Sequence, residues 1–265
     1  MSKISTVRKK ELDLIARERA DEIRRAWGLG IEPVSDIFGL IERRQKDVIV
    51  LRYPVSSQSL SAFIAINKDG SLIFVNTNMS LGRQIFSAAH ELSHFLYDRE
   101  HLHHNLLVCD PGQSLEDERE VLADRFAGAL LLPEEGVRNT YYSMFGYKHT
   151  ATHGTVMTLQ RIFKVSYAAM LFALLRCQII PTSLYNHLKK LGTIENAELL
   201  FQEAKKYGIK DLVAPTRDKV IPASLLHALT SNYTEGRISY KKLSSILALW
   251  DKVPEEMGFT YEEFI

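Results

Sequence analysis

Residues 90–94 read His-Glu-Leu-Ser-His, a spacing suited to holding a divalent metal ion. In a helix, side chains four positions apart lie on the same face, so the imidazoles of His90 and His94 can reach one ion together. Glu91 can act as the base that takes a proton from a metal-activated water. The pattern therefore predicts zinc held by His90 and His94, with Glu91 as the catalytic base.

The residues around this motif decide between a metal site and a surface helix that carries two unrelated histidines. Six positions close to the motif are apolar: Phe86, Ala88, Ala89, Leu92, Phe95 and Leu96. A helix with so many apolar residues should be largely buried, and buried imidazoles and carboxylates without a ligand are costly. The context favours the metal site.

A second helix, expected over residues 117–132, offers a third ligand. Glu120 and Asp124 lie one turn apart on one face of it. Two small residues, Ala123 and Ala127, share that face and allow another helix to approach closely. Glu120 can complete a site of two histidines and one carboxylate, and Asp124 can accept the distal N–H of a ligating histidine. A solvated acidic stripe better describes the acids at the start of the helix, Glu116, Asp117 and Glu118.

Other polar residues near the motif are weaker candidates. Asp98, one turn after His94, is a rival ligand of lower rank. A local histidine cluster (His101, His103 and His104) is better explained as a solvated loop, and Cys109 as an ordinary small residue. Candidates for an oxyanion donor follow the second helix: Tyr141, Tyr142, His149 and His153. Zinc is the default cofactor for the main ligand set, although imidazole and carboxylate ligands also suit manganese, iron and cobalt.

Two segments carry a resemblance to a known family. Residues 86–94 read FSAAHELSH, and residues 120–133 read EVLADRFAGALLLP. Together they resemble the ImmA/IrrE family of metallopeptidases, and the likeness extends over residues 47–175. Ser93 stands where the family usually has glycine, and Leu122 where it often has an acid, but neither change removes a predicted ligand. The resemblance implies a zinc-dependent endopeptidase that regulates transcription by cleaving a helix-turn-helix repressor, often encoded on a mobile element or in a stress-response operon.

The elements that must position these residues follow from local patterns. Apolar residues recur at helical spacing before Gly28, and the motif helix is expected over residues 83–97. Residues 47–53, 61–66 and 72–76 are β-rich, and a turn at residues 67–70 joins the last two as a hairpin. We expect an α+β, zincin-like domain with a small antiparallel sheet over residues 1–190. A helical C-terminal region over residues 191–265 is expected to gate or recruit the partner, and the alternative is that it gives structural support.

The composition excludes several classes of function. The chain has 265 residues, 46% of them hydrophobic, and its 33 basic and 32 acidic side chains give a formal charge of +1. This balance creates no field that would attract nucleic acid or an anionic membrane. Two cysteines are too few for a disulfide framework, and the charged N-terminal residues lack the apolar run of a signal peptide. We expect a cytoplasmic protein that acts on a protein partner without contacting a membrane.

The alternative function is a DNA-binding or protein-binding transcriptional regulator with a vestigial metal site. Residues 159–175 pass from one helix through a Lys-Val-Ser turn into another. The second of these helices offers almost no donors for base edges or phosphates, so we expect it to pack in the core. Direct nucleic-acid binding is therefore not expected. A protein substrate is expected to bind as an extended strand along the hairpin.

Overall fold

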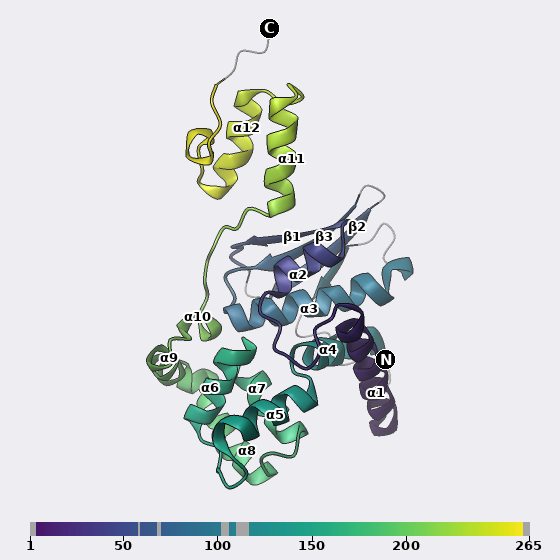
Figure 1. The fold of residues 1–265 in the computed structure, drawn as a ribbon, viewed down its shortest axis with the longest axis vertical. Helices are drawn as coiled ribbons and strands as arrows, with labels where there is room; N and C mark the ends of the chain where they lie inside the picture. Colours follow the sequence, from purple (N-terminus) through teal and green to yellow (C-terminus); the bar gives the residue numbers. More distant parts are fainter. Residues whose placement is uncertain (1–3, 58, 68–69, 102–105, 110–116, 262–265) are drawn as a thin grey trace.

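A computed structural model describes residues 4–57, 59–67, 70–101, 106–109 and 117–261 (Figure 1). The first half contains α1 (Thr6–Ala26), α2 (Ile37–Arg44), β1 (Val48–Tyr53), β2 (Ala62–Asn67), β3 (Gly70–Asn76), α3 (Leu81–Tyr97), β4 (Leu106–Cys109) and α4 (Glu118–Leu131). The second half contains α5 (Glu134–Phe145), α6 (His153–Phe163), α7 (Tyr167–Arg176), α8 (Thr182–Lys189), α9 (Ala197–Lys206), α10 (Lys210–Val213), α11 (Ala223–Thr234) and α12 (Tyr240–Leu247). The expected α+β fold, followed by a helical C-terminal region, is confirmed.

The four strands form one mixed sheet in the order β1-β3-β2-β4. β2 and β3 are antiparallel, with Asn67 opposite Gly70, as the turn residues predict; residues 68 and 69 lie outside the described residues. β4 is antiparallel to β2. β1, however, runs parallel to β3, with Val48 opposite Ser71. The expectation of a wholly antiparallel sheet is therefore corrected to a mixed one.

The parallel pair arises because β3 enters between β1 and β2. These two strands run in opposite directions without being neighbours, so a hairpin partner of β2 that fills the gap must run parallel to β1.

The buried side chain of Asn76 holds the loop between β1 and β2. Its Nδ2 donates to the carbonyls of Val55, Ser57 and Leu60, and its Oδ1 accepts from the Val55 amide.

The strand order also corrects the expected place of the substrate. β3 is flanked by β1 and β2, and β2 is flanked by β3 and β4, so neither hairpin strand has an open edge. The prediction that a substrate adds along the hairpin is wrong for that reason. Among the described strands, the edges of the sheet are β1 and β4.

Helix α3 lies between the sheet and α4, and α1 packs on α4 (Figure 1). Ser80 caps the start of α3 by accepting a hydrogen bond from the Arg83 amide. At Gly82 a Cβ atom would lie 2.8 Å from the Ser166 amide nitrogen and 2.9 Å from the Leu212 carbonyl oxygen. The first turn of α3 therefore needs glycine, because backbone from the α6–α7 turn and from α10 approaches it directly.

Helices α5 to α10 pack below the motif helix in Figure 1 and share its hydrophobic core. α6 and α7 are separated by Lys164, which has a left-handed φ of 54°, and they meet at 102°. Within the described residues, no single helix has the length and apolarity needed to span a membrane. Helices α6 and α7 reach that length and apolarity only when the two bent helices are taken together.

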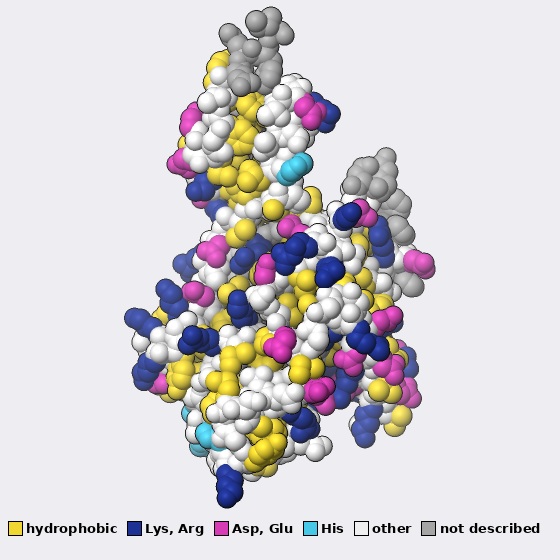
Figure 2. Space-filling model, viewed as in Figure 1, with side chains coloured by type: hydrophobic (Ala, Val, Ile, Leu, Met, Phe, Trp, Pro, Cys, Tyr) yellow, Lys and Arg dark blue, Asp and Glu magenta, His cyan; other side chains and the backbone are white. Residues whose placement is uncertain are grey.

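The end of the described chain forms a small unit of its own. Its buried side chains, from α11, α12 and the turn after them, are Leu229, Tyr233, Leu243, Leu247 and Phe259. The larger core spans residue 190, since it includes Leu188, Leu191, Ala204 and Leu212. The division of the chain after residue 190 stays a prediction. On the face drawn in Figure 2, acidic and basic side chains are interspersed, in keeping with the formal charge of +1.

An extended segment, residues 214–222, joins this unit to the sheet. The Val220 amide donates to the Arg52 carbonyl at the end of β1, and the Arg217 amide donates to the Thr77 carbonyl after β3. Next to them, Gln84 of α3 donates its side-chain Nε2 to Thr216 Oγ1 over 3.0 Å. The segment is therefore attached by hydrogen bonds both to the sheet and to the motif helix.

Arg24 fixes the far end of α4 to α1. Its buried guanidinium donates to the carbonyls of Gly30, Glu32 and Leu130. Leu130 belongs to the last turn of α4, where carbonyls have no partner within the helix. Burial lowers the pKa of Arg24, the charges of Asp21 and Glu32 only partly offset this effect, and the guanidinium still acts as a donor to all three carbonyls.

We expect Arg24→Met to lower the free energy of unfolding by about 2–4 kcal/mol, because three partly buried carbonyls lose a charged donor. Urea unfolding followed by circular dichroism measures this change. The matched control is Arg25→Met at the next, exposed position, which should change stability by less than about 0.5 kcal/mol. Equal midpoints for the two variants would contradict the role given to Arg24.

Candidate metal centre

Helix α3 places His90 and His94 one turn apart on its buried face. Both imidazoles are almost completely buried, with exposed fractions of 1%. Their ring centroids are 4.8 Å apart, and the two Nε2 atoms approach to 3.0 Å. The helical spacing therefore brings the two ring nitrogens to one point, as the motif predicts.

Helix α4 brings Glu120 to the same point. Glu120 Oε2 lies 3.2 Å from His90 Nε2, and Glu120 Oε1 lies 3.3 Å from His94 Nε2. One ligand atom from each of the three residues falls within 4.8 Å of the others, so together they could hold a metal ion. The helices can approach this closely because the face of α4 that bears Glu120 also carries Ala123 and Ala127, which are small and completely buried.

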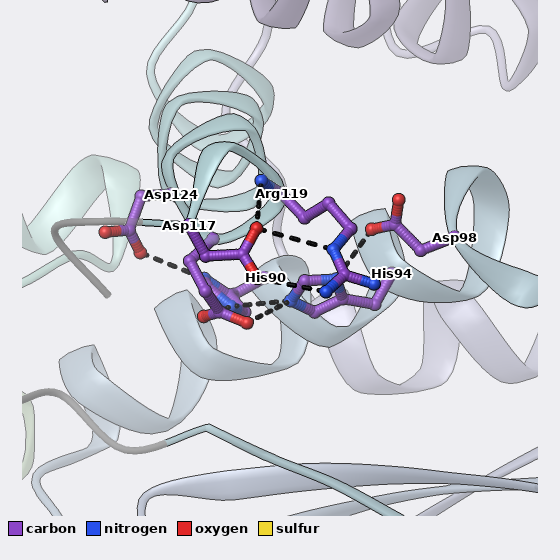
Figure 3. Close-up of polar contacts among 7 residues, drawn as sticks. His90, His94, Asp98, Asp117, Arg119 and Asp124 are labelled. Carbon is purple, nitrogen blue, oxygen red and sulfur yellow. Dashed lines mark hydrogen bonds and ion pairs between the residues drawn. The ribbon is translucent and has the colours of Figure 1, made fainter. Parts of the chain in front are cut away.

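Two further carboxylates hold the far nitrogens of the histidine rings (Figure 3). Asp124 Oδ1 lies 2.9 Å from His90 Nδ1, which is the contact that the sequence assigns to it. Asp98 Oδ2 lies 2.7 Å from His94 Nδ1. When an imidazole is neutral and its Nδ1 donates to the carboxylate, its Nε2 is left as the acceptor that faces the site.

The position of Asp98 changes its role. The sequence offers it as a rival ligand one turn after His94, but its contact is with the ring nitrogen opposite the convergence point. Asp98 is therefore a positioning residue, equivalent in geometry to Asp124. Its spacing of four residues showed that it would meet His94 but not which nitrogen it would meet, because that depends on the rotation of the imidazole ring.

The polar groups of the site perturb one another strongly. Burial alone would lower the pKa of His94, but hydrogen bonds to Asp98 and Glu120 outweigh it and raise the pKa to about 9. Burial alone would raise the pKa of Glu120, but the two imidazoles reverse this effect and hold its pKa well below the usual range. The donor set, two imidazole nitrogens and a carboxylate, fits zinc or a similar dication.

Glu91 is completely buried beside His90 on α3. Its charge acts on His94, whose pKa it helps to raise, so its carboxylate is close enough to influence the same site. Glu91 thus adds a second buried acid beside Glu120. Four carboxylates, from Glu91, Asp98, Glu120 and Asp124, surround the two imidazoles.

Other residues considered from the sequence lie elsewhere. Glu118 forms an ion pair with Arg8, with Arg8 Nη2 2.7 Å from Glu118 Oε2, and Asp117 caps α4 by accepting from the Arg119 amide (Figure 3). His103, His104 and Glu116 lie outside the described residues. The side chains of His101 and Cys109 are also outside the described part.

The candidate oxyanion donors gather around the start of α6. Tyr141 donates its hydroxyl to the His149 carbonyl, and His149 Nε2 lies 2.8 Å from Thr155 Oγ1. His153 Nδ1 lies 2.7 Å from the Tyr167 hydroxyl, and Tyr142 stacks with Tyr147. These contacts join the candidates to one another and to the core, so the oxyanion donor remains unassigned.

Comparison with known proteins identifies the part of the chain that carries the site. The model of Peptidase_M78, described as an IrrE N-terminal-like domain, matches residues 43–175. This span is 133 of the 265 residues and includes both α3 and α4. A search of curated proteins found no match.

Glu120→Ala should weaken zinc binding by more than about a hundredfold, since it removes one of three converging ligand groups. The matched control is Glu118→Ala, two residues earlier, which removes only the ion pair with Arg8. Competition with a chelator, combined with metal analysis of each purified variant, gives the comparison. Loss of metal from the Glu118 variant and its retention by the Glu120 variant would overturn the ligand assignment.

Zinc binding should become tighter as pH rises from about 7 to 9. Because the pKa of His94 in the metal-free protein is raised to about 9, its proton stabilises the fold below pH 6.5 and this contribution is lost as pH rises through 9. A metal must displace that proton, so affinity should rise by about tenfold per pH unit and level off above 9. Calorimetry in buffers of different ionisation enthalpy measures the proton released. Asp98→Asn should reduce that release at pH 7.5, and an affinity independent of pH would contradict the prediction.

Proposed function

The chain belongs to the Peptidase_M78 family, with its IrrE N-terminal-like domain, and from this premise we propose that it is a zinc-dependent endopeptidase that regulates transcription by cutting a partner protein. The observation that carries the proposal is the convergence of His90, His94 and Glu120 within the matched residues. Membership of a metallopeptidase-type family and a group of residues able to bind a metal ion both support a metal-dependent peptidase.

Three residues would hold the ion, through Nε2 of His90, Nε2 of His94 and the carboxylate of Glu120. When bound there, zinc would supply Lewis-acid activation of a water molecule and of the scissile carbonyl. Asp98 and Asp124 keep the two imidazoles turned so that Nε2 faces the ion. Three protein ligands leave room for water and substrate, as in catalytic zinc sites.

Glu91 would move the proton. Its carboxylate takes a proton from the attacking water as the water oxygen bonds to the carbonyl carbon. The same carboxyl then delivers the proton to the amide nitrogen as the C–N bond breaks, so the leaving fragment departs as an amine. Glu91 ends each cycle as it began, and no other reactant than water is consumed.

We place the extended substrate against β4. Strands β2 and β3 are occupied on both sides, whereas β4 pairs with β2 alone among the described strands. Backbone groups on the outer side of an edge strand can bind a main chain without demanding a particular sequence. The substrate would still bind by strand addition, but along β4 instead of along the hairpin of β2 and β3.

We propose a helix-turn-helix repressor as the partner, on the strength of the family resemblance of residues 47–175. The same resemblance suggests a cytoplasmic role in a stress response or on a mobile element. The C-terminal region, residues 191–265, contains a small unit with its own core and is our candidate for recruiting the partner.

The alternative, a DNA-binding regulator with a vestigial metal site, is less well supported. Helix α7 would be its recognition helix, but half of its side chains are buried: Tyr167, Met170, Leu171, Ala173 and Leu174. A recognition helix must present polar side chains to base edges. Salt-dependent binding of random duplex DNA by the purified protein would favour this alternative.

Glu91→Gln should keep one zinc per chain while lowering the rate of cleavage by at least about a hundredfold, because the amide cannot accept the proton. The assay mixes zinc-loaded protein with the helix-turn-helix repressor encoded nearest to its gene and follows fragments by mass spectrometry. The wild type treated with a chelator, then restored with zinc, is the control.

Equal cleavage by the wild type and the Glu91 variant would exclude Glu91 as the base. A wild type that cuts unfolded casein but leaves the repressor whole would contradict the partner and retain the peptidase. A zinc-loaded wild type that cuts neither protein would contradict the proposed activity itself.

A further inference from the structure

A cavity of about 300 Å³ lies between α1, α3, α4 and α7. Its lining residues on α4 begin at Val121 and recur three, four and seven positions later, and those on α7 begin at Ala169 and recur at the same intervals. Each set is therefore one face of its helix. Among the described residues that line the cavity there is neither a ligand group of the metal centre nor Glu91. The cavity is thus separate from the place where a peptide bond would be cut.

The walls of this cavity carry an excess of positive charge. The charged side chains that line it are three cations, Lys9, Arg125 and Arg176, and one anion, Asp124. Arg176 is already engaged within the chain, because its Nε forms an ion pair with Glu134 Oε1 over 3.5 Å. Within the part of the chain that the structure describes, Lys9 and Arg125 form no ion pair. Two cations are therefore available to an anion that enters from solvent.

The rest of the wall is apolar and includes the aromatic rings of Phe86 and Phe172. Phe172 is 41% exposed, so the cavity opens to solvent beside this ring. Gly128, in the middle of α4, also lines the cavity, and a Cβ atom added there would have no neighbour within 4 Å. Aromatic walls around open space suit a flat apolar group that can stack. At about 30 Å³ for each water-sized group, the cavity holds about ten non-hydrogen atoms.

Asp124 belongs to both the cavity and the metal centre. Its side chain is 44% exposed, and its Oδ1 lies 2.9 Å from His90 Nδ1, whereas Glu120 approaches Nε2 of the same ring (Figure 3). The cavity therefore lies behind His90, on the side opposite to the ion. A negative charge bound there would offset the repulsion of a dication by Lys9 and Arg125, so it should favour zinc at the metal centre.

We propose that this cavity binds an aromatic carboxylate, with a flat apolar body and about ten non-hydrogen atoms, and that the bound anion raises the affinity of the metal centre for zinc. Its carboxylate pairs with Arg125, which can donate two parallel hydrogen bonds, and with Lys9. Its ring packs against Phe86 and Phe172 above Gly128. The cavity is then a regulatory site, and its occupation does not depend on the proposed peptidase activity.

Three compounds of nearly equal size test the choice of ligand: 3-phenylpropanoate, the uncharged 3-phenylpropanamide and the cationic 3-phenylpropylamine. Each is titrated into the zinc-loaded full chain by calorimetry. One 3-phenylpropanoate should bind per chain, at least about fivefold more tightly than the amide, because hydrogen bonds between charged groups are stronger than neutral ones. The cation should bind most weakly. Equal affinities for the acid and the amide, or no binding of the acid, would overturn the proposal.

Gly128→Leu tests the position of the ligand by filling the cavity from within. It should weaken the binding of 3-phenylpropanoate by at least about tenfold. Gly128→Ala is the matched control and should stay within about threefold of the wild type, because one methyl group leaves most of the cavity open. Both variants should keep their zinc and melt about 1–4 °C higher, since each replaces a glycine within a helix. Unchanged affinity in a folded Gly128→Leu protein would place the compound elsewhere and overturn the proposal.

The role of the two cations is tested at constant net charge. A double variant, Lys9→Gln with Arg125→Gln, removes the cations that line the cavity. Its control, Lys10→Gln with Arg161→Gln, removes two exposed cations that do not line it. Only the first variant should lose the preference for the acid over the amide. Equal loss in both would show a general attraction of anions to the protein and contradict the proposed site.

A titration without zinc tests the link to the metal centre. A coupling between two sites acts equally in both directions, so chain freed of zinc by a chelator should bind 3-phenylpropanoate about two- to fivefold more weakly than zinc-loaded chain. The compound should tighten zinc binding by the same factor, and Gly128→Leu should abolish this effect. Equal affinities with and without zinc would overturn the regulatory role. Binding that vanishes without zinc, yet persists in zinc-loaded Gly128→Leu, would place the carboxylate on the ion and overturn the cavity as its site.

Discussion

Glu120 lies on α4 and the two imidazoles lie on α3, so the site exists only where these helices pack closely. Ala123 and Ala127 are completely buried on the face of α4 that bears Glu120, and larger side chains at these positions would force the helices apart. The sheet supports α3 from its other side, and α1 supports α4. Much of the first half of the chain therefore holds α3 and α4 at a fixed distance from each other.

Electrostatics explains why such a site suits a cation. Four carboxylates surround two imidazoles in a largely buried region, and their mutual repulsion would be costly without positive charge nearby. In the metal-free protein a proton on His94, whose pKa is raised, compensates part of this negative charge. A dication at the convergence point would compensate more of it. The same residues thus set the affinity for metal and the pH at which protons compete with it.

The sequence predicted the parts of the site that depend on helical spacing. The approach of His90 to His94, and the shared face of Glu120 and Asp124, need only a period of 3.6 residues. The order of the strands, the short strand β4 and helix α5 depend on contacts between distant segments or on weak local patterns, and were missed. Asp98 was given the wrong contact because ring rotation is set by tertiary packing.

The segment at residues 214–222 has a mechanical consequence. Gln84 is completely buried near the start of α3; its Nε2 donates to Thr216 in that segment, and its Oε1 accepts from Arg52 at the end of β1. A force that pulls the C-terminal unit away from the sheet first loads the backbone bonds of Val220 and Arg217 to the sheet. Once these give way it reaches Thr216, and breaking the bond from Gln84 leaves a buried amide proton without that acceptor, at a cost of about 1–3 kcal/mol. Gln84 lies on the helix bearing His90, six residues before it. Tension on the C-terminal unit would thus act on α3 at a residue less than two helical turns before His90.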